Sequence, residues 1–149
     1  MLKKPSIIQG EKHSDARGGM SFVNAFSMDA VKRFYVIEPK NTEIIRAWQG
    51  HKQEEKWFHV LNGSFAVVLV EIDNWATPSD NLPYEKFVLE AHNNQVLHVP
   101  KGYANGFIAL EADARLLVFS DASLAESADD NYRFDANKWF DWSQIGQNY

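Results

Sequence analysis

The chain of 149 residues contains no cysteine, which excludes disulfides, zinc–thiolate sites, iron–sulfur clusters and cysteine nucleophiles. It has no basic excess either: 15 Lys and Arg against 20 Asp and Glu give a net charge of −5, which disfavours binding to nucleic acid. The longest apolar run, Phe65–Val70, has six residues, far below the roughly 20 that a membrane helix needs. No apolar stretch follows the charged Met1-Leu-Lys-Lys-Pro5 start, which predicts that there is no signal peptide. We therefore expect a cytoplasmic protein that binds neither nucleic acid nor a membrane.

What the sequence does contain is typical of one globular domain over residues 1–149, with 45% hydrophobic and 23% charged residues. No long segment shows a helical period, but many short segments rich in Val, Ile, Phe and Trp are bounded by Gly, Pro, Asn or Asp. Each is predicted to be a strand: Ser21–Phe26, Arg33–Glu38, Glu43–Trp48, Lys56–Leu61, Phe65–Ile72, Glu85–Glu90, Gln95–Val99, Gly106–Leu110 and Ala114–Ser120.

The segments between these strands support an all-β fold. Asn62-Gly63 lies between two predicted strands and is a strong two-residue hairpin signal. The polar stretch Asp73–Pro83 predicts a loop, and the tail after Asp121 has room for one or two helical turns. Strands at this spacing predict an all-β sandwich or barrel of the jelly-roll type.

One polar segment has the spacing of a known barrel motif. Gln49 and His51 are two apart and share one face of a strand, Lys56 and Gly63 follow, and Pro100-Lys-Gly-Tyr-Ala-Asn105 comes later. This frame resembles the two motifs of the cupin barrel, whose ligands are His, His, Glu and His. Gln49, His51, Lys56 and Asn105 stand at those positions. A divalent metal prefers imidazoles and carboxylates over amides and an ammonium, so we expect no catalytic metal.

Further motifs resemble the sugar-nucleotide branch of the cupins, namely the 3,5-epimerases of dTDP-4-dehydrorhamnose and the 3,4-ketoisomerases of dTDP-4-keto-6-deoxyglucose. Together they span most of the chain: Asp15-Ala-Arg-Gly18, Lys32-Arg-Phe-Tyr-Val-Ile37, Arg46-Ala-Trp-Gln-Gly-His-Lys52, Val99-Pro-Lys-Gly-Tyr-Ala-Asn-Gly-Phe107, Leu116–Asp121 and Asp129-Asp-Asn-Tyr132.

The resemblance implies a single cupin-type jelly-roll barrel, a homodimer, and isomerisation or epimerisation of a nucleotide-linked 4-keto-6-deoxy sugar for surface polysaccharides, without a cofactor. It implies that His51 removes a proton beside the ketone and that Tyr35 is the second proton carrier. Substrate-binding roles are implied for Arg17 and Arg46 on the diphosphate and for Gln49, Lys56 and Asn105 on the sugar.

Departures from the family pattern leave alternatives open. Gln49 stands where the epimerases have their base, and the position of their catalytic tyrosine falls on Val118. Neither side chain transfers protons at neutral pH, so the usual 3,5-epimerase mechanism is not expected. The alternative is a non-catalytic sugar-nucleotide or carbohydrate-binding cupin, and a metal-dependent oxygenase is disfavoured by the ligand set.

Residues an odd number of positions apart face opposite sides of a regular strand. Arg46 therefore faces away from Gln49 unless a bulge lies near Gly50. Lys56 likewise faces away from His51 unless the chain bends within Gln53–Glu55.

Overall fold

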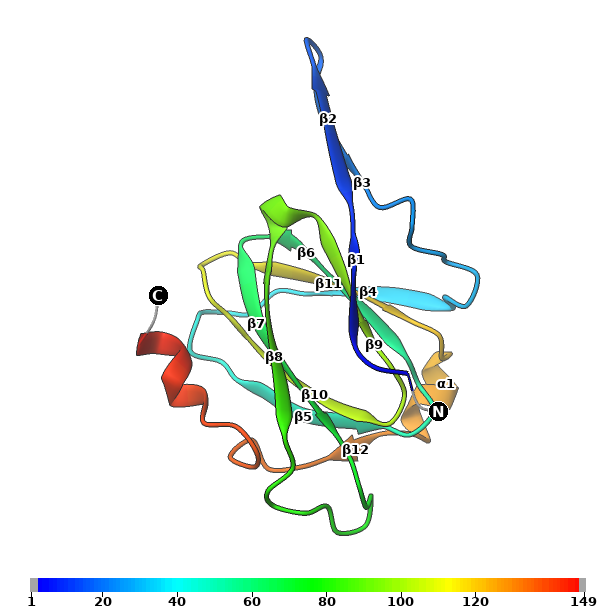
Figure 1. The fold of residues 1–149 in the computed structure, drawn as a ribbon, viewed down its shortest axis with the longest axis vertical. Helices are drawn as coiled ribbons and strands as arrows, with labels where there is room; N and C mark the ends of the chain where they lie inside the picture. The colour runs from blue at the N-terminus through cyan, green and yellow to red at the C-terminus, as the bar shows by residue number, and fades with distance from the viewer. Residues whose placement is uncertain (1–2, 148–149) are drawn as a thin grey trace.

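Two five-stranded antiparallel sheets face each other in the computed structural model, which describes residues 3–147 (Figure 1). The first sheet contains, in spatial order, β1 (Ser6–Gln9), β9 (Gln95–Val99), β6 (Lys56–Asn62), β11 (Arg115–Ser120) and β4 (Arg33–Ile37). The second contains β12 (Tyr132–Arg133), β5 (Arg46–His51), β10 (Tyr103–Ala109), β7 (Ser64–Glu71) and β8 (Tyr84–Glu90).

A separate hairpin, β2 (Glu11–Asp15) and β3 (Gly18–Phe22), projects from the body of the molecule (Figure 1). The helical elements are short: the 3-10 turns η1 (Ala91–Asn93) and η2 (Trp142–Gln147) and the helix α1 (Leu124–Ala128). No helix in the described part of the chain is long and apolar enough to cross a membrane.

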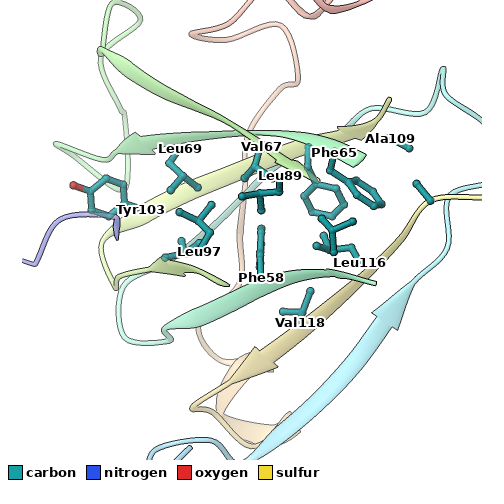
Figure 2. Packing of buried hydrophobic residues seen from close by; sticks show 14 residues of the cluster. Phe58, Phe65, Val67, Leu69, Leu89, Leu97, Tyr103, Ala109, Leu116 and Val118 are labelled. Atoms are coloured by element: carbon teal, nitrogen blue, oxygen red, sulfur yellow. The ribbon is translucent and has the colours of Figure 1, made fainter. Parts of the chain in front are cut away.

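The main core lies between the two sheets. Alternate residues of each strand point inward, so Phe58 of β6 and Leu116 and Val118 of β11 meet Phe65 and Val67 of β7 (Figure 2). All five side chains are almost completely buried. Some inward-facing positions of these strands carry polar residues, and the same alternation places those side chains between the two sheets.

The second sheet is covered on its outer face as well. Ala66, Val68 and Val70 of β7 pack there with Trp48 and with Trp142 of the C-terminal segment. A strand that is buried on both faces needs apolar residues at every position. This explains the unbroken apolar run at Phe65–Val70.

Most predicted strands are present, with shifted ends, and the tail carries the expected helical turns. Two predicted ranges were largely misplaced: β3 ends at Phe22, so most of Ser21–Phe26 is not strand, and β5 begins only at Arg46. Three strands were missed, β1, β2 and β12. Most of their residues are solvent-exposed, so they lack the apolar alternation from which a strand is predicted.

The predicted hairpin at Asn62-Gly63 was wrong. Gly63 does turn the chain with a positive φ of 73°, but β6 and β7 belong to different sheets. β6 pairs with β9 and β11, and β7 pairs with β8 and β10. A turn dipeptide sets the local chain reversal, whereas strand partners are decided by long-range packing.

Candidate functional site

A cavity of about 480 Å³ opens between the sheets, within the size range of small-molecule sites. No acidic side chain lines it among the described residues. Its lining consists of the cations Arg33, Arg46, Lys56 and Arg133, the neutral polar residues Tyr35, Gln49 and Asn105, and mainly apolar walls that include Ile37, Phe58, Phe107 and Val118.

Strand β4 supplies two of these groups by simple alternation. Arg33, Tyr35 and Ile37 face the cavity, whereas Phe34 faces solvent and is 67% exposed. The Arg33 guanidinium lies 5.1 Å from the centre of the Tyr35 ring. Burial, with Glu54 nearby, raises the pKa of Tyr35 to about 12, so this phenol keeps its proton at neutral pH and acts as a donor.

A bulge in β5 lets Arg46 and Gln49 reach the same cavity. Asn105 of β10 pairs with Gln49 and Phe107 pairs with Arg46, so Ala47 and Trp48 together stand opposite one residue, Gly106. A Cβ atom on Gly106 would lie 2.7 Å from the Ala47 Cβ atom, so glycine leaves room for the bulge. The bulge predicted near Gly50 therefore lies at Ala47–Trp48.

Lys56 reaches the cavity from the opposite sheet, after the bend predicted within Gln53–Glu55. It is only 3% exposed, and its Nζ donates to Gln49 Oε1 at 3.0 Å. Gln49 Nε2 in turn donates to Asn131 Oδ1 at 3.0 Å, which fixes the orientation of the amide. Burial lowers the pKa of Lys56 to about 8; Glu54 opposes this shift, and Arg33 adds to it.

His51 lies behind the cavity wall and is not among the lining residues. It is 2% exposed, and its Nδ1 is 2.7 Å from the carbonyl oxygen of Asp130. Since a carbonyl only accepts, Nδ1 carries the proton and Nε2 the lone pair. That Nε2 is buried and has no hydrogen-bond partner among the described residues. Burial and the Lys56 cation lower the pKa of His51, so the ring is neutral at pH 7.

Glu54, a buried carboxylate beside His51, was not indicated by the sequence motifs. Its Oε2 accepts a hydrogen bond from Ser120 Oγ at 2.7 Å and lies 3.5 Å from the guanidinium nitrogen Nη2 of Arg33. Its Oε1 lies 3.5 Å from His51 Nδ1. Burial raises the pKa of Glu54, but the Ser120 hydrogen bond and the cation of Lys56 outweigh burial, and the pKa lies below its usual value.

Arg17 does not join the cavity within one chain. It lies on the projecting β2–β3 hairpin with its side chain 89% exposed, and it pairs with Asp15 at 2.6 Å. The structure thus brings together Tyr35, Arg46, Gln49, Lys56 and Asn105, sets His51 just behind them, and leaves Arg17 apart.

Two cavity arginines were missed from the sequence. Arg33 could have been found, because it precedes Tyr35 by two residues and so shares its face. Arg133 gave no local signal, because it enters the site only through the pairing of β12 with Gln49.

The cavity does not suit a metal ion. Within residues 3–147 no three His, Asp or Glu side chains converge as a ligand set. Lys56 stands at one of the four cupin motif positions, and its ammonium lies against Gln49 at another, so it would repel a cation.

The jelly roll of two facing sheets, with a cation-lined cavity between them, defines a cupin-type protein. Over residues 2–146 the chain matches the dTDP-4-dehydrorhamnose 3,5-epimerase family, and it belongs to that family. The predicted all-β cupin jelly roll and the predicted relation to the dTDP-sugar epimerases and ketoisomerases are confirmed, although the two sheets do not close into the barrel that was expected.

Solved structures of similar fold include a single-residue variant of the 3,4-ketoisomerase QdtA from Thermoanaerobacterium thermosaccharolyticum in complex with TDP-4-keto-6-deoxyglucose, with 20% identity, a TM-score of 0.70 and 90% of each chain covered. The rmlC epimerase of Mycobacterium tuberculosis has 18% identity, a TM-score of 0.75 and coverage of 93% of this chain and 74% of its own. The sugar epimerase NovW from Streptomyces spheroides has 15% identity, a TM-score of 0.75 and coverage of 95% and 75%. A comparison with curated protein sequences gave no match.

Proposed function

We propose that the cavity between the sheets binds a nucleoside diphosphate-linked 4-keto-6-deoxy sugar and that the protein isomerises or epimerises this sugar. The observation that carries the proposal is the gathering of four cations on one cavity, with no carboxylate among the described residues that line it. Family membership and the sugar-nucleotide ligand in the QdtA structure support it.

The cations are arranged by depth. Arg46 and Arg133 are solvent-exposed and make no ion pair with other described residues, whereas Lys56 is buried. Guanidinium groups bind phosphate oxygens through paired N–H donors. This arrangement favours a diphosphate at the mouth and a sugar pointing inward, beside Lys56, Tyr35 and Asn105.

A larger hollow of about 940 Å³ lies against the C-terminal segment and is less suited to this ligand. Its charged lining residues are the carboxylates of Glu43, Asp80 and Asp141. They would repel a diphosphate. The charge of the lining, rather than the size of the hollow, decides the choice.

Binding is tested by thermal shift with dTDP and UDP. At about 100 times the dissociation constant, a ligand adds roughly 2.7 kcal/mol to the free energy of unfolding. We expect Arg133→Ala to weaken dTDP binding about 10- to 100-fold, since a hydrogen bond to a charged group contributes about 1.5–3 kcal/mol.

The matched control is Arg115→Ala, because Arg115 is exposed on β11 and pairs with Glu38 away from the cavity. The absence of a shift with every nucleoside diphosphate at millimolar concentration would contradict the proposal.

A binding protein without catalysis is the second candidate. It is favoured by Gln49, whose amide is held on both sides by Lys56 and Asn131 and cannot carry a proton. Solvent exchange separates the two candidates: in D₂O an isomerase or epimerase is expected to introduce deuterium beside the ketone of TDP-4-keto-6-deoxyglucose, measured by mass spectrometry. Tight binding without exchange would leave only the binding function.

The cellular setting that we propose is the cytoplasmic synthesis of sugar precursors for surface polysaccharides.

We also propose a homodimer, which is supported by the exposed Phe34 and Val36 on the edge strand β4. A monomer in sedimentation equilibrium would contradict the proposed homodimer. A diphosphate contact by Arg17 requires such a second chain, because Arg17 does not line the cavity of its own chain.

A further inference from the structure

We propose that Lys56, rather than His51, is the catalytic residue that removes the substrate proton, and that His51 is a positioning residue behind it. The inference rests on the proposed function. It starts from the placement of the two side chains: Lys56 lines the cavity, whereas His51 does not.

The other polar groups of the cavity cannot take up a proton near neutral pH. Gln49 and Asn105 are amides, and arginine stays protonated. Tyr35 keeps its proton, since its pKa is raised to about 12. Among the described lining residues this leaves the amine of Lys56 as the group that can act as a base.

The surroundings of Lys56 keep part of the amine neutral. Burial lowers its pKa to about 8, with Arg33 and Arg133 acting in the same direction and Glu54 and Asp130 against it. The neighbouring His51 interacts with Lys56 electrostatically, and the Tyr35 ring lies 6.0 Å from Nζ. About half of the amine is therefore unprotonated at pH 8.

The chemical step balances within the site. The neutral amine takes the proton from the carbon beside the C4 ketone, the C–H electron pair forms a C=C bond, and the carbonyl π pair moves onto oxygen. The enolate oxygen lies in a cavity with the Tyr35 hydroxyl and the arginines, which favour negative charge. When the ammonium returns a proton to the same face of that carbon, the carbonyl and the original sugar form again, and this is the exchange step. The epimer forms when the Tyr35 hydroxyl instead gives a proton to the opposite face, after which the Tyr35 phenolate regains a proton from water and the Lys56 ammonium loses one to water. Exchange of the ammonium protons with D₂O puts deuterium into the sugar.

Gln49 holds the amine, and this provides a specific test. Gln49→Glu would replace the amide oxygen 3.0 Å from Nζ by a carboxylate. A carboxylate at that distance stabilises the ammonium and raises its pKa. If Lys56 is the base, the pH at which exchange reaches half its maximum rises in this variant. A purely structural role of Lys56 would leave that pH unchanged.

The experiment measures deuterium incorporation into TDP-4-keto-6-deoxyglucose between pH 6 and 10, with dTDP binding as the test of folding. For wild type we expect an inflection near pH 8. Lys56→Met is expected to slow exchange by roughly 10²- to 10⁴-fold while dTDP still binds, and ethylamine is expected to restore part of the rate in Lys56→Ala. His51→Asn is expected to slow exchange less and to keep the inflection.

Exchange in Lys56→Met within tenfold of wild type, or an inflection lost only in His51→Asn, would overturn the assignment to Lys56. Failure of the proposed isomerase or epimerase function gives a different result, because wild type itself would then exchange no deuterium, whether or not it binds dTDP.

Discussion

Asp130→Ala is expected to lower the free energy of unfolding by about 3–5 kcal/mol, and the melting temperature by about 10–20 °C. The buried Asp130 carboxylate accepts three backbone N–H groups, from Lys52, Gln53 and Glu54, each at 2.8 Å. These bonds hold the bend between β5 and β6. Alanine would leave all three donors without their charged acceptor, and the N–H of the buried Glu54 is poorly placed to find water.

The matched control for this prediction is Asp129→Ala. Asp129 is adjacent in the sequence but solvent-exposed, so its replacement is expected to change the stability by less than about 0.5 kcal/mol. Urea denaturation followed by tryptophan fluorescence measures both variants. Equal stability of the two would show that the Asp130 carboxylate does not hold the bend.

Lys56→Met is expected to raise the free energy of unfolding at pH 7, by up to about 3 kcal/mol. In the folded protein burial lowers the pKa of Lys56 from 10.5 to about 8, so keeping the ammonium charged inside the fold opposes folding. Methionine has a similar length and carries no charge, and buried ionic groups are often replaced by apolar ones with a gain in stability. The lost hydrogen bond to Gln49 reduces the gain.

The difference in the free energy of unfolding between Lys56→Met and wild type is expected to shrink as the pH rises. Below pH 8 the lysine is protonated in both the folded and the unfolded chain, and the full destabilisation is present. As the pH rises from 8 towards 10.5, the folded chain holds the neutral amine while the unfolded chain still binds a proton, so wild type gains stability relative to Lys56→Met. Denaturation curves at pH 7, 9 and 10.5 are therefore expected to converge. A difference that stays constant with pH would show that Lys56 is not destabilised by its charge.

Together these variants separate stability from catalysis. At pH 7, Lys56→Met is expected to be more stable than wild type and to have lost most of its proton exchange. A functional site often retains a group that weakens the fold, and the buried ammonium of Lys56 is such a group.

Much of the fold could be predicted from the sequence, because half-buried strands alternate apolar and polar residues. Arg33–Ile37 shows this directly, with Tyr35 inward and Phe34 outward. The spacing of Gln49, Lys56 and Asn105 also predicted that these side chains share one site, and the structure places them on one cavity. The hairpin at Asn62-Gly63 was predicted wrongly, because its local turn signal says nothing about which strands the two segments pair with.

What the amino-acid sequence determined by itself is the all-β class, the absence of thiol chemistry and the set of polar residues that stand at the cupin motif positions. Only the tertiary structure decided that Arg133 completes the cation cluster, that Arg17 lies outside it, and that His51 is behind the wall while Lys56 lines it. The physical reason is that these relations depend on long-range pairing, such as β12 with β5, and on a bulge opposite Gly106. Side-chain alternation fixes which face of a strand a residue occupies, but which groups meet across two sheets is fixed only when the sheets pack.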